Sequence, residues 1–124
     1  MSTLKLDTLS NKAGTASVPS DTIVSGTAKA WVNFNGTGTV AIRRAFNVSS
    51  ITDRGTGTYT VNFTNAMADA NYCAVITHEN IDYGGTSWIQ SSAGVTASSI
   101  EIASYDNAYF NYLDTEVFCV AVFS

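Results

Sequence analysis

Alternation of apolar and polar residues between glycine-rich turns constrains this chain more than any other feature. Residues 58–63 read Thr-Tyr-Thr-Val-Asn-Phe, so three apolar side chains face one side of an extended strand and polar side chains face the other. The preceding turn contains Gly55 and Gly57, which supply the positive-φ positions that a hairpin needs. Residues 48–52, which read Val-Ser-Ser-Ile-Thr, come before the turn. We therefore predict a β-hairpin over residues 46–63.

Similar short stretches, separated by turn residues, recur along the rest of the chain. They predict further strands at residues 28–34, 40–43, 72–77, 87–90, 98–105 and 116–123. Only residues 65–71 have the composition of a helical turn. Many short strands without an amphipathic helix predict an all-β fold, an antiparallel β-sandwich or jelly-roll-like domain over residues 28–124.

The first 27 residues have a different character. Leu4, Leu6 and Leu9 form a short apolar stripe, and residues 10–27 are mostly small and polar. Such a segment is too polar to add to a core, so we predict an extended N-terminal arm over residues 1–27. The three leucines are its candidate attachment residues.

Two features suggest contacts between subunits. The apolar strand near the end of the chain must be central in a sheet or covered by another subunit, and its candidate interface residues are Phe118, Val120 and Val122. Arg43 and Arg44 are adjacent, so on a strand they point to opposite faces and one of them points inward. That arginine needs an acidic partner, within the chain or across a subunit interface.

Charge is sparse and unevenly distributed. Only 13% of the 124 residues are charged, whereas Ser, Thr, Asn and Gly together contribute 49 residues. Residues 1–54 contain all six basic residues and three acidic ones, and residues 55–124 contain seven acidic residues. This balance argues against nucleic-acid binding, and the longest apolar runs are too short for a membrane-spanning helix.

The cysteines Cys73 and Cys119 each lie within an apolar stretch. Two cysteines are too few for a disulfide framework. Buried free thiols are the simpler interpretation, and a bridge between two strands is the alternative.

Catalytic signatures are weak. The only histidine, His78, precedes Glu79, and these two residues with Asp82 are a conceivable metal site. Asp106 and Asp114 are a conceivable pair of glycosidase carboxylates. No recognisable phosphate loop, nucleophile elbow or paired-histidine motif accompanies them, so we predict no enzymatic activity, no metal and no cofactor.

Binding chemistry is better represented, because two loops combine aromatic rings with short polar side chains. Such surfaces suit sugars, whose C–H faces stack on rings while Asp and Asn bind their hydroxyls. The alternative is that the rings pack between strands or subunits, and for Trp88 a place in the core is favoured. The candidate receptor- or glycan-binding residues are Tyr83, Trp88, Tyr105, Asp106, Asn107, Tyr109 and Tyr112.

The first part of the chain carries a further signal, in the leader residues 4–9 and 11–14 and in residues 28–43, 46–53, 55–57, 59–63, 67 and 69–72. Over roughly residues 1–75, these segments resemble a family of small tail-fibre-like structural proteins of tailed bacteriophages. The resemblance implies a virion protein, most simply a homotrimer, in a tail fibre or similar appendage. Its partners would be other virion proteins and a host-surface polysaccharide. A capsid decoration protein without a receptor is the alternative.

Overall fold

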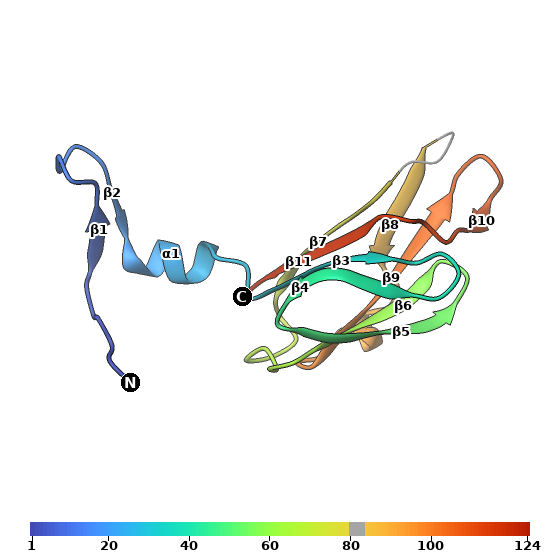
Figure 1. The fold of residues 1–124 in the computed structure, drawn as a ribbon, viewed down its shortest axis with the longest axis horizontal. Helices are drawn as coiled ribbons and strands as arrows, with labels where there is room; N and C mark the ends of the chain where they lie inside the picture. The colour runs from blue at the N-terminus through green and yellow to red at the C-terminus, as the bar shows by residue number, and fades with distance from the viewer. Residues whose placement is uncertain (80–83) are drawn as a thin grey trace.

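The structure is a computed structural model that describes residues 1–79 and 84–124. About half of the described residues lie in strands, and all strand pairings among them are antiparallel. Figure 1 shows a body that contains most of the strands and an N-terminal arm that projects from one end of it. The expectation of a mostly β chain is therefore confirmed.

One sheet of the body has four strands in the order β4-β3-β11-β7. Its central strand β11 pairs with β3 on one side and with β7 on the other. The most apolar strand of the chain thus lies inside a sheet. The bounds of the four strands are Ala30–Asn35 (β3), Ala41–Phe46 (β4), Cys73–His78 (β7) and Phe118–Phe123 (β11).

The other sheet has five strands, in the order β10-β9-β6-β5 with β8 also paired to β9. β9 connects most of this sheet, because it pairs with β6, β8 and β10. The strands are Val48–Gly55 (β5), Thr58–Phe63 (β6), Gly85–Ile89 (β8), Ser99–Asp106 (β9) and Asn111–Tyr112 (β10).

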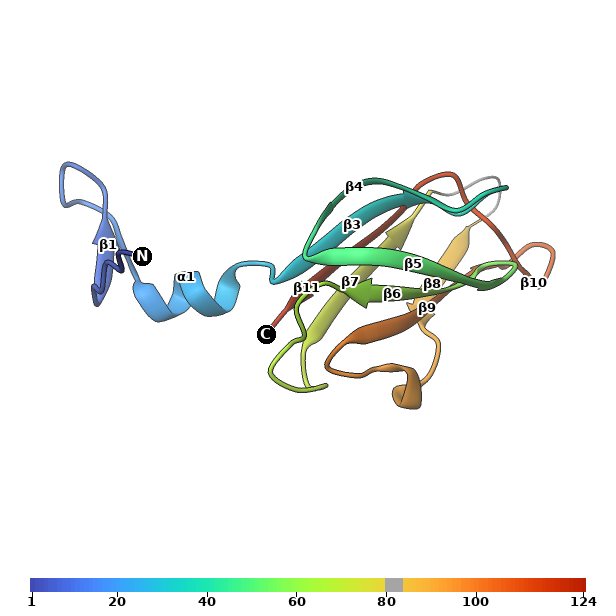
Figure 2. The ribbon, with the colours of Figure 1, turned by 60° about the horizontal axis from the view of Figure 1, so that its bottom comes forward.

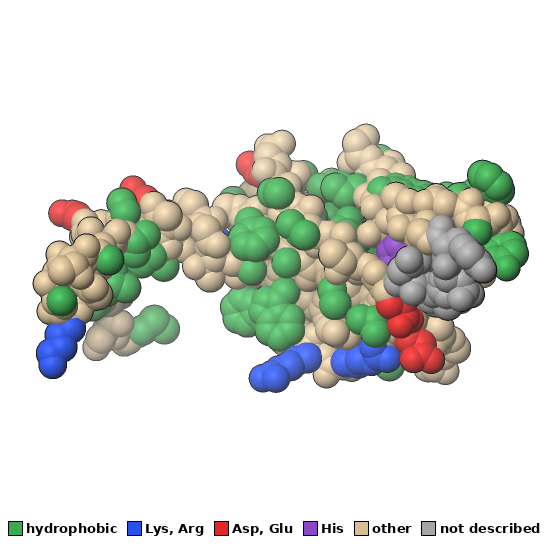
Figure 3. All heavy atoms as spheres, turned by 90° about the horizontal axis from the view of Figure 1, so that it is seen from above, with side chains coloured by type: hydrophobic (Ala, Val, Ile, Leu, Met, Phe, Trp, Pro, Cys, Tyr) green, Lys and Arg blue, Asp and Glu red, His purple; other side chains and the backbone are tan. Residues whose placement is uncertain are grey.

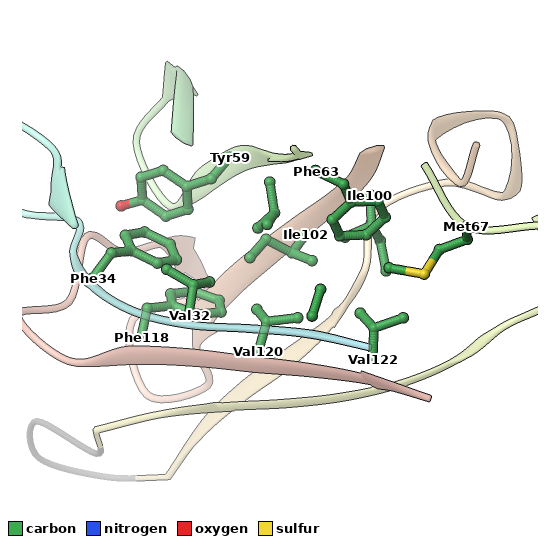
Figure 4. Close-up of a cluster of buried hydrophobic side chains, with 12 residues drawn as sticks. Val32, Phe34, Tyr59, Phe63, Met67, Ile100, Ile102, Phe118, Val120 and Val122 are labelled. Carbon is green, nitrogen blue, oxygen red and sulfur yellow. The ribbon is translucent and has the colours of Figure 1, made fainter. Parts of the chain in front are cut away.

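Side chains from both sheets form one buried cluster (Figure 4). The rings of Phe34 and Phe118 stack with centroids 5.1 Å apart, and Tyr59 meets Phe34 edge-on at 5.1 Å. All three side chains are fully buried. Burying one side chain of this size contributes about 1.5–3 kcal/mol. The alternation that predicted β6 also explains why Tyr59 is buried, because Tyr59 lies on the inward face of this strand.

A carboxylate and a buried tyrosine join three loops at one end of the body. Asp114 Oδ1 accepts hydrogen bonds from the Tyr59 hydroxyl at 2.6 Å and from the Gly57 backbone N–H at 2.7 Å. The Tyr59 hydroxyl also lies 3.1 Å from the Gly36 carbonyl oxygen. Burial, and then the hydrogen bond to Asp114, raises the pKa of Tyr59 well above its ordinary range, so this hydroxyl stays protonated as a donor.

The predicted hairpin is confirmed, and its turn has the predicted backbone. β5 ends at Gly55 and β6 begins at Thr58, and Gly55 and Gly57 have φ of 121° and 64°. The other predicted strands also form, with ends shifted by at most three residues.

The helical predictions were wrong. Residues 65–71 form no helix, since Met67 is buried and its backbone N–H donates to the Ala97 carbonyl at 2.7 Å. A long-range contact therefore replaces the local helical bonds. Instead, helix α1 (Ser20–Gly26) forms in the arm and a 3₁₀ turn (Ser92–Gly94) forms between β8 and β9.

The arm is folded rather than fully extended. Strands β1 (Thr8–Ser10) and β2 (Ser17–Pro19) pair as a small hairpin, and α1 follows directly. Figure 2 shows the arm again standing clear of the body after a 60° turn. None of residues 1–27 is buried, and the buried cluster draws only on residues of the body. No helix in the described ranges is long and apolar enough to cross a membrane.

Both cysteines are free thiols, so the disulfide alternative is not supported. The prediction that they are buried was wrong: Cys73 is exposed and Cys119 is half-buried. Each lies at an outward position of its strand, because the inward positions of β7 and β11 alternate with them.

Candidate functional site

Three of the predicted binding residues come together on the outer face of the five-stranded sheet. Trp88 lies on β8, Tyr105 on β9 and Tyr112 on β10. Tyr112 is directly opposite Tyr105, and Trp88 is opposite Ala103. Because Ala103 and Tyr105 are two residues apart on one strand, all three aromatic side chains share a face.

The three rings are in mutual contact and form what we call the aromatic cluster. Ring centroids are 5.8 Å apart for Trp88 and Tyr105, 6.0 Å for Trp88 and Tyr112, and 5.7 Å for Tyr105 and Tyr112. Tyr112 is 42% exposed, and the other two are half-buried. The expectation that Trp88 belongs to the core was wrong. The rings hold each other in place and still offer a surface to solvent.

Polar groups that we did not predict border the aromatic cluster. Gln90 Nε2 lies 3.4 Å from the Tyr112 hydroxyl, and Arg54 pairs with Glu101 at 2.8 Å. A hollow of about 250 Å³ lies beside these groups. It is lined by Arg54, Gln90 and Glu101 together with Thr58, Tyr59 and Ile102. Alternation along β9 would have been enough to place Glu101 on the same face as Tyr105. Arg54 and Gln90 could not have been found in this way, because they reach this face through pairing between strands that are distant in the sequence.

Two other candidates have structural roles instead. Asp106 Oδ1 accepts from the backbone N–H groups of Ala108 at 2.7 Å and Tyr109 at 3.3 Å, which shapes the β9–β10 turn. Asn107 Nδ2 donates to the Gly84 carbonyl and, at 2.9 Å, to the Thr86 hydroxyl, which ties that turn to β8. Both side chains therefore hold the loop that presents the cluster.

The remaining loop candidates lie outside the cluster. Tyr109 and Phe110 stand at the tip of the β9–β10 turn, with 66% and 77% exposure, and no ring contact is formed by either within the described residues. Tyr83 lies outside the described residues. The structure thus separates an ordered cluster from an exposed tip.

The described carboxylates among the catalytic and metal-site candidates are engaged by the protein itself. Asp114 holds Tyr59 and Gly57, and the Glu79 carboxylate accepts from the backbone N–H groups of Glu116 and Val117. Asp82 lies outside the described residues. Within residues 1–79 and 84–124, no group of three or more His, Cys, Asp or Glu side chains is placed to hold a metal ion.

Acidification is expected to destabilise the fold through His78. Burial lowers the pKa of this imidazole below its ordinary value of 6.5, an effect partly opposed by the charge of Glu79. The unfolded chain therefore binds the proton more readily, and the free energy of unfolding falls as the pH drops below about 6.5. Urea titrations at about pH 7.5 and 5.5 measure this loss. In His78→Gln the corresponding part of the pH dependence should disappear; an unchanged dependence would contradict the prediction.

The apolar interface candidates require a correction. Phe118, Val120 and Val122 are 0%, 3% and 1% exposed within the single chain, where they belong to the buried cluster. They cannot contact a second subunit, because β11 is central in its sheet and these side chains face the core.

The arginine pair also differs from the prediction. A register shift lies between Asn33 and Phe34, with Arg44 opposite Asn33 and Ile42 opposite Phe34, so Arg43 is an extra residue in β4. Both arginines are exposed, and neither points into the core. Their availability for an external contact therefore stays a prediction.

The three attachment candidates differ in exposure. Leu4 and Leu9 are 85% and 54% exposed, whereas Leu6 is half-buried. Two of the three leucines are thus open to a partner.

Comparison of the chain with protein-family models, with curated proteins and with solved structures found no match.

Proposed function

We propose that this chain is a bacteriophage virion structural protein that adsorbs to a host-surface polysaccharide. The observation that carries the proposal is the aromatic cluster beside the polar hollow on the outer face of the five-stranded sheet. The family resemblance of residues 1–75 supports a place in a tail fibre or similar appendage, within a homotrimer. The two sheets with one shared core support a β-sandwich as the finer fold class.

The chemistry of the cluster suits a hydroxyl-rich ligand. Exposed faces of Trp88 and Tyr112 can stack on the C–H face of a sugar ring. The Tyr112 hydroxyl and the Gln90 amide lie at its border and can exchange hydrogen bonds with sugar hydroxyls. Arg54 and Glu101 add one charged donor and one charged acceptor in the adjacent hollow. Because this ion pair is internally balanced, it favours a neutral polysaccharide over a highly charged one.

Binding to host cells and to their extracted surface polysaccharide tests the proposal. Tyr112→Ala is expected to weaken binding at least about tenfold, because loss of one anchoring ring costs about 1.4 kcal/mol or more. Tyr109→Ala is the matched control, since it removes a neighbouring exposed tyrosine that lies outside the cluster. Equal losses for both variants, or no saturable binding by the unmodified protein, would contradict a cluster-based site.

A capsid decoration protein is the second candidate. The specific observation in its favour is the projecting arm, whose apolar side chains Leu4, Leu9 and Val24 are exposed. Such an arm can fasten a small domain to a protein lattice. Affinity for capsids and increased capsid heat resistance, without binding to host cells, would favour this role over receptor binding.

A further inference from the structure

The outer face of the four-stranded sheet carries an uncovered apolar row. Strand pairing aligns Phe46, Trp31, Ala121 and Val75 across β4, β3, β11 and β7. Phe46, Trp31 and Val75 are 54%, 36% and 52% exposed. Figure 3 shows hydrophobic side chains grouped over the body, with Lys or Arg side chains and adjoining Asp or Glu side chains along one border. We call this surface the sheet face.

A second uncovered apolar surface lies on the arm of the same chain. Leu4, Leu9, Ile23 and Val24 are 85%, 54%, 38% and 62% exposed, and α1 has no buried residue. A helix of seven residues gains little stability on its own, so most of its stability must come from packing an apolar side against something. Within the described chain, no segment buries Ile23 or Val24, the apolar residues of α1.

The connection between arm and body keeps the two surfaces of one chain apart. The Lys29 backbone N–H donates to the Val122 carbonyl at 2.7 Å, and its ammonium group donates to the Val24 carbonyl at the end of α1. Only Thr27, Ala28 and Lys29 separate α1 from β3. The arm therefore points away from the body (Figures 1 and 2), and its apolar side chains are open to solvent.

Both uncovered apolar surfaces belong to this chain, and the charges beside them are compatible with a second copy as the partner. Arg43 and Arg44 are exposed on β4 beside the sheet face, and the only ion pair among the described residues is Arg54–Glu101. The arm carries exposed Asp7 and Asp21, the latter in the first turn of α1, and also exposed Lys5 and Lys12, so its charges are locally separated and not acidic overall. An approach of Asp21 to Arg43 or Arg44 would place opposite charges at the border of the apolar contact and fix its orientation.

We propose that the arm of one copy packs on the sheet face of a second copy. α1 and the β1–β2 hairpin cover the row of Phe46, Trp31 and Val75, and the arm carboxylates approach Arg43 and Arg44. A stable contact buries roughly 800 Å² per partner, a size that suits an arm of about 25 residues. If each copy gives its arm to the next copy and the last gives its arm to the first, these contacts close a symmetric ring. This proposal is independent of glycan binding.

Complementation between two full-length variants tests the exchange. The arm variant carries Ile23→Asp and Val24→Asp, and the face variant carries Phe46→Glu and Val75→Glu. All four positions are exposed, so both variants should keep the fold, which near-UV circular dichroism checks. The measurement is mass by light scattering at two concentrations that differ about tenfold, against a chain mass of 13.1 kDa.

The unmodified protein is expected to be an oligomer and each variant alone a monomer. An equimolar mixture of the variants should form a dimer, because the intact arm of one still binds the intact sheet face of the other. An arm variant that stays oligomeric would overturn the proposal in favour of direct contact between sheet faces. A monomeric unmodified protein, or a mixture that stays monomeric, would overturn it as well.

Thiol labelling gives a second, local readout. Cys73 is exposed and shares the outward side of β7 with Val75, so the exchanged arm should shield it. In a Cys119→Ser background, the arm variant is expected to react with a maleimide several-fold faster than the parent. Equal rates would show that the arm leaves this face uncovered.

Discussion

Replacing Gly57 with alanine is expected to destabilise the protein by about 3 kcal/mol or more, which is a large fraction of the stability of a small domain. Gly57 has a φ of 64°, where an alanine costs about 1 kcal/mol. A Cβ at this position would also lie 2.7 Å from the Leu113 nitrogen and 2.7 Å from the Ser104 carbonyl oxygen. These neighbours are backbone atoms, so the loops themselves must move apart.

Gly38→Ala is the matched control for this prediction. Gly38 has nearly the same φ, 62°, and an added Cβ would meet nothing within 4 Å. Its cost should therefore be the conformational part alone, about 1 kcal/mol. Urea titration followed by tryptophan fluorescence measures both variants. Equal losses at the two glycines would show that the close approach of the loops to Gly57 contributes nothing.

The hairpin over β5 and β6 could be predicted because its signals are local. Alternation assigns the inward residues of β6, and two glycines specify the turn between the strands. No contact with a distant segment is needed to interpret either pattern. The same local logic gave the positions of most other strands within three residues.

Local reasoning failed where a distant contact decides the structure. Residues 65–71 have helical composition, yet Met67 is buried and bonded to Ala97, about thirty residues away in sequence. Residues 20–26 contain β-branched residues and lack a side-chain cap, yet they form α1. Arg43 and Arg44 both reach solvent because a bulge breaks the alternation that sequence reasoning assumes.

The candidate site shows the same division. Its aromatic residues were identified by type, since Trp and Tyr in polar loops are typical of binding surfaces. Their meeting depends on the register of β8, β9 and β10, which no local pattern specifies. Tyr109 lies outside the cluster, at the tip of the β9–β10 turn. Asp106 and Asn107 stabilise this turn through hydrogen bonds to Ala108 and Thr86. Residue types therefore suggested the chemistry, and long-range pairing selected the members.

Asp114→Ala is expected to cost about 3 kcal/mol of stability, because it removes the acceptor shared by Tyr59 and Gly57. Hydrogen bonds to a charged group contribute about 1.5–3 kcal/mol each, and the Gly57 N–H is left unpaired in a buried position. Asp114→Asn keeps an amide oxygen in the same place and should lose less. Asp69→Ala is the control, since the Asp69 carboxylate bonds the Asn71 N–H on an exposed loop.

A double-mutant cycle with Tyr59→Phe isolates the bond between the two side chains. Tyr59→Phe alone removes the hydroxyl and leaves Asp114 bonded to Gly57, so we expect a loss of about 1.5 kcal/mol. The double variant should lose less than the sum of the two single losses, since the 2.6 Å bond is counted in both. Strict additivity would contradict the coupling. A stable Asp114→Ala variant would free this carboxylate from its structural role and reopen its assignment as a catalytic group.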